Sequence, residues 1–159
     1  MSFPHINIKY INILDYKQNF IVSKEDKLKY GEIYTPFSLI EQMFNLFEPS
    51  VFTQKDKKWL DPGAGTGYFS IYLFDKLNKG LQSELPNDEE RKSHIIEKML
   101  YMIEIKESNI LTLRQHFGKK ANIIHTDPSK AANHIQDIYH DPLRWWTSDE
   151  VIKARKKFN

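Results

Sequence analysis

The stretch WLDPGAGTGYF, at residues 59–69, constrains the fold of this 159-residue chain more than any other segment. Trp59 and Leu60 suit a short strand, three glycines follow at alternate positions, and a nearly unbroken apolar run from Tyr68 to Leu77 suits a helix buried against a sheet. Glycines let the chain turn tightly and bring backbone N–H groups close to a ligand beside a helix N-terminus. The segment therefore predicts a ligand-binding βα unit.

The chain beyond this unit keeps the same order of strand and helix. Apolar segments at 100–105 and 121–126 predict a second and a third strand, each bounded by charged or turn-forming residues. A helix is expected between them over 108–117, with Gly118 just past its end, and Gly80 is the expected stop of the preceding helix. Such alternation is typical of a parallel α/β sheet.

Upstream of the glycine loop, a second motif predicts the start of a helix. Thr35 offers a hydroxyl N-cap and Pro36 suits the first helical position. Apolar residues then recur at helical spacing, which predicts one buried face made of Leu39, Ile40, Met43, Phe44 and Phe47. We expect residues 1–29 to form an N-terminal arm with a strand-like beginning, and residues 30–159 to form one domain.

Composition excludes several classes of protein. Hydrophobic residues at 40% and aromatic residues at 13% indicate a globular chain. The sequence has no cysteine, which rules out disulfides and thiolate metal sites, and its six histidines show no metal-ligand spacing, so no metal site is predicted. No apolar run is long enough to cross a membrane and no signal pattern is present, so we expect a cytoplasmic protein. A net charge of +2 permits a polyanionic partner without requiring one.

The chemistry of the glycine loop narrows its ligand. Gly63, Gly65 and Gly67 give G-x-G-x-G, where a dinucleotide fingerprint would give G-x-G-x-x-G, and no Gly-Lys-Ser/Thr follows as in a phosphate-binding P-loop. A carboxylate at Asp61 would repel a pyrophosphate, whereas it could hold a cationic ammonium group. These features favour a ligand that resembles a nucleoside at one end and an amino acid at the other, such as S-adenosylmethionine.

Two segments together carry a resemblance to a known family. Residues 61–67, DPGAGTG, resemble the first motif of S-adenosylmethionine-dependent methyltransferases, and residues 31–36, GEIYTP, resemble the upstream motif of DNA N6-adenine methyltransferases. The resemblance runs from about Tyr30 to Asp127. It implies an incomplete Rossmann-like class I methyltransferase sheet, with the first three βα units and an N-terminal helix. It also implies S-adenosylmethionine as the cofactor, transfer of its methyl group to adenine N6 in DNA, and a setting such as restriction-modification.

The same resemblance implies roles for particular residues. The helix start after Tyr34 would bind the methionine end of the cofactor, because free N–H groups there attract a carboxylate. Glu104 would accept the ribose hydroxyls, and Asp127 would meet the adenine amino group. The predicted cofactor-binding residues are Tyr34, Thr35, Pro36, Asp61, Gly63, Gly65, Gly67, Glu104, Ile105 and Asp127.

Simpler roles stay open for some of these residues. Thr35 and Asp127 can be plain helix or turn caps, and Glu104 can be an ordinary charge at a strand end. Glu104 also lies much further along the chain from Asp61 than the roughly 20 residues that usually separate the loop from a ribose-binding acid. The polar segment 82–91, QSELPNDEER, accounts for the excess as an inserted surface loop.

The methyl-acceptor side has no counterpart in the sequence. Amino methyltransferases of DNA carry an Asn/Asp-Pro-Pro-aromatic tetrapeptide that bonds the exocyclic amine and stacks on the flipped base. Residues 127–130, DPSK, and 141–144, DPLR, match only its first two positions, so no catalytic residue is predicted. We expect the cofactor-binding half of an enzyme, inactive alone, that reaches DNA through a separate part. A second polypeptide would complete the sheet beside strand 58–61.

Two other classes of function remain open. The missing tetrapeptide favours a non-catalytic cofactor-binding or scaffold subunit. A nicotinamide-binding oxidoreductase domain is the third possibility, and both the glycine spacing and Asp61 disfavour it.

Overall fold

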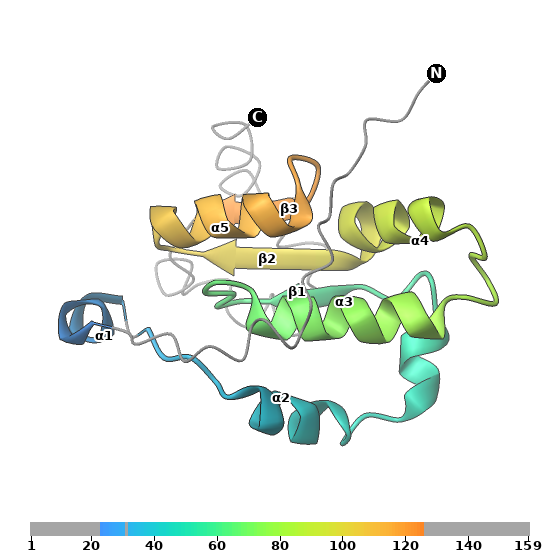
Figure 1. Ribbon diagram of the computed structural model, residues 1–159, viewed down its shortest axis with the longest axis horizontal. Coiled ribbons are helices and arrows are strands. Elements are labelled where there is room, and N and C mark those ends of the chain that lie inside the picture. Colours follow the sequence, from blue (N-terminus) through green and yellow to red (C-terminus); the bar gives the residue numbers. More distant parts are fainter. Residues whose placement is uncertain (1–22, 31, 126–159) are drawn as a thin grey trace, which may run out of the picture.

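The computed structural model describes residues 23–30 and 32–125. The first 22 residues of the arm expected at 1–29, together with Asp127 and the segments after it, lie outside these described residues, and the rest of that arm is helical from Lys24. No helix in the described ranges is long and apolar enough to cross a membrane. The elements follow in the order α1 (Lys24–Tyr30), α2 (Phe37–Phe44), the 3-10 helix η2 (Pro49–Thr53), β1 (Trp59–Asp61), α3 (Tyr68–Gly80), α4 (Asp88–His94), the π-helix η3 (Ile95–Met99), β2 (Leu100–Glu104), α5 (Glu107–Phe117) and β3 (Asn122–His125) (Figure 1).

The strands form a parallel sheet in the order β1-β2-β3, which confirms the predicted incomplete Rossmann-like α/β fold. Asp61 at the end of β1 pairs with Met102, and Glu104 at the end of β2 pairs with His125. Parallel pairing brings the carboxyl ends of all three strands to one edge of the sheet. The loops that follow β1 and β2 therefore leave the sheet side by side.

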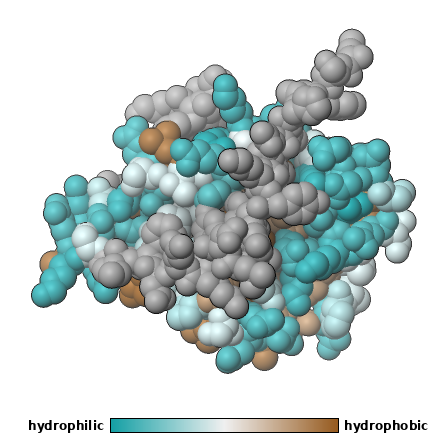
Figure 2. All heavy atoms as spheres, viewed as in Figure 1, coloured by the Kyte–Doolittle hydropathy of each residue, from teal (hydrophilic) through white to brown (hydrophobic). Residues whose placement is uncertain are grey.

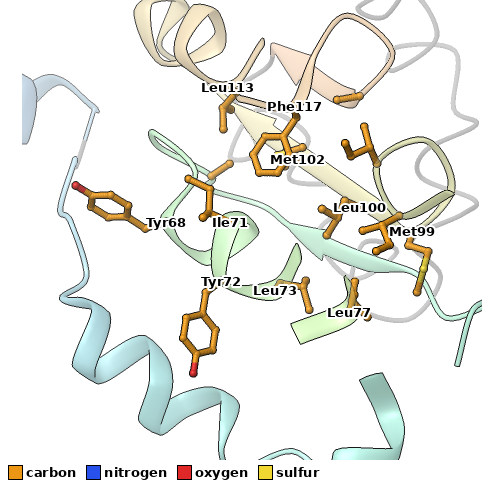
Figure 3. Packing of buried hydrophobic residues seen from close by; sticks show 14 of the residues in the cluster. Tyr68, Ile71, Tyr72, Leu73, Leu77, Met99, Leu100, Met102, Leu113 and Phe117 are labelled. Carbon is orange, nitrogen blue, oxygen red and sulfur yellow. The ribbon is translucent and has the colours of Figure 1, made fainter. Parts of the chain in front are cut away.

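Helix α3 contacts β2 of the sheet as well as α2, η2 and η3. Ile71, Leu73 and Leu77 are all buried, and they lie among Leu100, Met102, Leu113 and Phe117 (Figure 3). Burying a side chain of this size contributes about 1.5–3 kcal/mol. The nearly unbroken apolar run in this helix follows from that position, since neighbours cover it on several sides.

Helix α2 differs from its prediction at its start and on its apolar face. Pro36 is the N-cap, without a side-chain hydrogen bond, so Thr35 lies outside the helix. Ile40 and Phe44 are buried, the latter against Tyr72 at 5.1 Å between ring centroids. The other predicted members of the face, Leu39, Met43 and Phe47, are 46%, 42% and 47% exposed. Figure 2 shows apolar side chains at the surface along the lower edge of the molecule. A narrow contact with α3 explains this, because it covers one stripe of the helix only.

Gly80 ends α3 for a reason other than the one predicted. It is the last helical residue, and the positive-φ glycines, Gly65, Gly67 and Gly118, do not include it. A Cβ atom at this position would overlap the carbonyl oxygen of Phe52 in η2. The glycine therefore permits close approach of two backbones.

The polar segment 82–91 is tied back to α3 through its last residue, and its end belongs to helix α4 rather than to the predicted loop. Arg91, only 4% exposed, donates to Asn78 Oδ1 at 2.8 Å and to the carbonyl of Leu85 at 2.7 Å. The π-helix η3 follows α4 directly and leads into β2. Asn122 of β3 donates from Nδ2 to the carbonyls of Glu97 and Leu100, at 2.9 and 3.1 Å, and so fixes the point where the π-helix gives way to β2.

Candidate functional site

A cavity of about 250 Å³ lies where the chain leaves β1 and β2. Ligands of open α/β sheets bind outside the carboxyl ends of the strands, and this cavity has that position. It lies just below the roughly 300–1,000 Å³ usual for ligand pockets. Its wall is built from Tyr30, Glu32, Ile33, Tyr34, Pro62, Gly63, Gly65, Glu104, Ile105 and Asn109.

Two left-handed glycines shape the loop between β1 and α3. Gly65 has φ +55° and Gly67 has φ +99°, values that other residues rarely adopt. The amide of Ala64 donates to the carbonyl of Ile103 at 2.9 Å, which ties the loop to β2. A Cβ atom at Gly67 would come within 2.8 Å of Leu113 Cδ2, whereas one at Gly63 would meet no atom within 4 Å. Gly63 therefore borders open space in the pocket.

Glu104 holds the loop after β1 and the turn after β2 with one carboxylate. It is 6% exposed, and its Oε2 accepts a hydrogen bond from the Gly65 amide at 2.6 Å. Its Oε1 accepts from the amides of Ile105 and Lys106 at 2.9 and 2.7 Å. A carboxylate oxygen has two acceptor positions, so Oε2 can accept one further bond from a ligand hydroxyl.

Glu32 forms the centre of a second polar group on the opposite wall. Its Oε1 accepts from Tyr34 Oη and Asn109 Nδ2, each at 2.8 Å, and its Oε2 pairs with Lys106 Nζ at 2.9 Å. Burial by itself raises the pKa of the Glu32 carboxyl, but the donors Asn109, Lys106 and Tyr34 outweigh it and hold this pKa below its ordinary value. Burial, and then the bond to Glu32, raise the pKa of the Tyr34 hydroxyl. Glu32 is therefore ionised at neutral pH and Tyr34 is a hydrogen-bond donor.

Asp61 lies below the glycine loop and outside the pocket wall. Its Oδ2 accepts a hydrogen bond from Ser70 Oγ at 2.8 Å, which links the end of β1 to the first turn of α3. Burial raises the pKa of the Asp61 carboxyl, with hydrogen bonds from Ser70 and the Gly63 amide acting in the other direction and the Glu104 charge adding to the rise. Its position supports a role in shaping the loop, and its predicted contact with a cofactor ammonium stays a prediction.

The predicted site residues divide into three groups. Tyr34, Gly63, Gly65, Glu104 and Ile105 line the pocket, whereas Thr35, Pro36, Asp61 and Gly67 lie outside its wall. Asp127 lies outside the described residues. Among residues 23–30 and 32–125, no cluster of three His, Cys, Asp or Glu side chains could hold a metal ion. The cofactor role of each predicted residue stays a prediction.

Sequence reasoning missed part of the pocket wall. The missed residues are Tyr30, Glu32, Ile33, Pro62 and Asn109. Glu32 and Ile33 lie inside the GEIYTP motif, and Pro62 inside the glycine loop, so the motifs themselves were a usable signal. Asn109 lies in the first turn of α5, directly after the end of β2. Ligands of parallel sheets bind beyond the strand ends, so this position was also a usable signal. Tyr30 had no signal of this kind.

Comparison with known proteins adds two findings. Residues 119–159 match the model of the LIC12162 family transferase. Over 111 residues the chain is 30% identical to an "Uncharacterized adenine-specific methylase" of Mycoplasma pneumoniae, an alignment that covers 67% of this chain and 26% of that protein. The chain thus spans about a quarter of the length of that relative. At a coarse level, both similarities support a methyltransferase-like transferase.

Proposed function

We propose that the pocket binds S-adenosylmethionine and that the chain is the cofactor-binding portion of a DNA adenine-N6 methyltransferase. The observation that carries the proposal is the meeting of the glycine loop, Glu104 and the segment around Tyr34 at one cavity beyond the strand ends. The GEIYTP motif contributes part of the wall of that same cavity. The adenine-specific name of the Mycoplasma pneumoniae relative agrees with this substrate class.

The residues of the pocket fit such a cofactor. Glu104 Oε2 accepts one bond from Gly65 and has capacity for a ribose hydroxyl, and Ile105 beside it offers an apolar side chain to the adenine. Gly63 leaves open space where a ligand can approach the backbone. When bound, the cofactor supplies the sulfonium methyl group. The residues named here bind and orient it.

The glycine loop argues against a nicotinamide dinucleotide. Its spacing is G-x-G-x-G, where a dinucleotide fingerprint has G-x-G-x-x-G, and Asp61 lies directly before it. A carboxylate there disfavours a pyrophosphate, and residues 62–67 supply no cation to offset it. The second candidate function is instead a cofactor-binding or scaffold subunit, favoured by the absence of an Asn/Asp-Pro-Pro-aromatic tetrapeptide from the sequence.

Binding of the demethylated product, S-adenosylhomocysteine, tests the cofactor. We expect isothermal titration calorimetry to show saturable binding of this compound and none of NAD⁺ at the same concentration. The variant Gly63→Ala should fold normally and lose affinity at least tenfold, because its methyl group enters the open space that the ligand needs. Ser83→Ala, at an exposed position after α3, is the matched control and should bind like the wild type. Tighter binding of NAD⁺ would overturn the proposal.

Methyl transfer tests the reaction separately from binding. Incubation with radiolabelled S-adenosylmethionine and adenine-containing DNA should give no labelled DNA with this chain alone. We expect label at adenine N6 when a second polypeptide carrying the tetrapeptide is supplied. Cofactor binding with no transfer in any such combination would favour the scaffold function.

A further inference from the structure

Lys106, in the turn between β2 and α5, contacts two separate parts of the N-terminal segment. Its Nζ lies 2.9 Å from Glu32 Oε2 and 3.1 Å from Asp26 Oδ2. The same ammonium group lies over the ring of Tyr30, 5.8 Å from its centroid. One cation therefore bridges α1, the chain just before α2, and the strand end that carries Glu104.

The segment that Lys106 holds forms a wall of the pocket. Tyr30, Glu32, Ile33 and Tyr34 all line the cavity, together with Glu104 and part of the glycine loop. Figure 1 shows α1 beyond the arrowhead of β2, at the edge of the sheet where the pocket lies. Displacing α1 would therefore take Tyr30 out of the wall and open the pocket at that point.

Few apolar contacts with the rest of the described residues keep α1 in place. The helix has seven residues and none of them is buried, and Leu28 is 89% exposed. A helix this short is unstable in water without tertiary contacts. The position of α1 therefore depends on charged and aromatic contacts with Lys106, which weaken when salt screens them.

The two ion pairs of Lys106 differ in strength. The Glu32 side chain is 7% exposed and accepts two further hydrogen bonds, from Tyr34 and Asn109. The Asp26 side chain is 29% exposed and belongs to a helix without buried residues. An exposed pair is weak and salt-sensitive, whereas a buried pair that is also hydrogen-bonded persists. The Asp26 contact is therefore the one that opens first.

We propose that Lys106 is a positioning residue that fastens α1 as a detachable wall of the pocket, and that its ion pair with Asp26 sets how fast a bound ligand leaves. The identity of the ligand rests on the proposed function. The fastening of α1 by Lys106 does not, because it is a property of the ligand-free chain.

Hydrogen exchange of the ligand-free protein tests the fastening by itself. The variant Asp26→Asn removes the charge that pairs with Lys106, and Glu25→Gln, one residue away on the same exposed helix, is the matched control. Amides of α1 should exchange about two- to fivefold faster in Asp26→Asn than in the wild type, and unchanged in Glu25→Gln. The difference should vanish at 1 M salt. Equal exchange in all three proteins at low salt would overturn the fastening.

Release of S-adenosylhomocysteine, followed by stopped flow, tests the consequence for the ligand. We expect Asp26→Asn to release it about two- to fivefold faster than the wild type, and Lys106→Met faster still. Lys106→Arg should restore slow release, since it keeps the cation. Unchanged release in Asp26→Asn and Lys106→Met would overturn the proposal even if the wild type binds well. A wild type that binds no S-adenosylhomocysteine would instead overturn the proposed function, and the exchange result would still decide the fastening.

Discussion

At the scale of single residues, the strand ends carry two carboxylates in opposite surroundings. Glu104 accepts three backbone N–H groups and borders the cavity, whereas Asp61 lies under the loop with one hydroxyl partner in Ser70. Hydrogen bonds to a carboxylate favour its charged form, and burial opposes it. At Asp61 burial is the larger effect, and it raises the pKa of that carboxyl.

The raised pKa of Asp61 predicts that Asp61→Asn stabilises the fold, by an amount that depends on pH. Because the folded state binds the Asp61 proton more tightly, the stability from this group is fully present below the ordinary pKa of about 3.9 and is lost as pH rises through the folded value. Asparagine keeps an acceptor for Ser70 and never ionises. Thermal unfolding should therefore show a higher Tm for the variant at pH 7, with a gain that shrinks toward pH 4. A lower Tm at pH 7 would contradict this account.

The left-handed conformation of Gly67 predicts a large effect of Gly67→Ala. The residue has φ +99°, and the added methyl would come within 2.8 Å of Leu113 Cδ2 in the buried core. We expect a loss of about 2–4 kcal/mol in the free energy of unfolding, measured by urea denaturation. The control is Gly63→Ala, whose methyl meets nothing within 4 Å and should leave that free energy within about 0.5 kcal/mol of the wild type.

At the scale of elements, Gly80 decides how closely η2 packs on α3. Alanine is favoured over glycine inside a helix by about 1 kcal/mol. The new Cβ would overlap the carbonyl oxygen of Phe52, which is backbone and cannot rotate away. Overpacking of this kind costs about 1–3 kcal/mol, so the clash outweighs the gain in helix propensity.

Gly80→Ala is therefore expected to lower the free energy of unfolding by up to about 2 kcal/mol. Urea denaturation monitored by tryptophan fluorescence suits the measurement, because one of the three tryptophans, Trp59, stacks on Phe52 with ring centroids 5.5 Å apart. Lys79→Ala, on the preceding exposed position, serves as the control and should change little. Increased stability of Gly80→Ala would show that η2 moves aside without cost.

Elements with a strong apolar pattern could be predicted from the sequence, and the others could not. The strands at 100–104 and 122–125 and the helices α3 and α5 each carry several buried residues, whereas the half-buried strand at 59–61 was predicted from the glycine loop that follows it. Helix α1 has no apolar pattern because ion pairs hold it, so the sequence showed only exposed charge.

The residues of the site also divide into those that the sequence could predict and those that it could not. Residues within the two motifs were found because short local patterns encode them, as with Tyr34 and Gly65. Asn109 and Lys106 were missed because their roles arise from contacts with Glu32, far away in the chain. Contacts of that kind depend on the folded arrangement of β2 and α5 and leave no local pattern.

At the scale of the whole molecule, ligand binding should stabilise the fold against heat. A ligand at 100 times its Kd that binds only the folded state adds about 2.7 kcal/mol. For a chain of this size that corresponds to a rise in Tm of roughly 5–11 °C. Differential scanning fluorimetry with S-adenosylhomocysteine should show this shift, and the same assay with NAD⁺ should show none. Absence of a shift in the wild type at this ligand concentration would contradict binding of the ligand to the folded state.

The sheet also bears on the partners of the chain. Within the described residues, β1 pairs with β2 alone, and its other edge meets no described strand. An unpaired edge is a ready site for another strand. Completion of the sheet by a second polypeptide, and contact with DNA through it, stay proposals. Co-expression with a polypeptide that carries the tetrapeptide, followed by size-exclusion chromatography, checks for such a complex.

The anchoring of the polar segment after α3 has a practical consequence for engineering. Arg91 ties the segment to α3, and Asn122 fixes the start of β2. A change in the length of the chain before Arg91 should therefore not displace β2 or the pocket at its far end. Gln82 and Ser83 are exposed and lie before both anchors. A fluorescent reporter domain spliced between these two residues would be carried at the end of the sheet opposite the pocket, and the binding site would keep its shape.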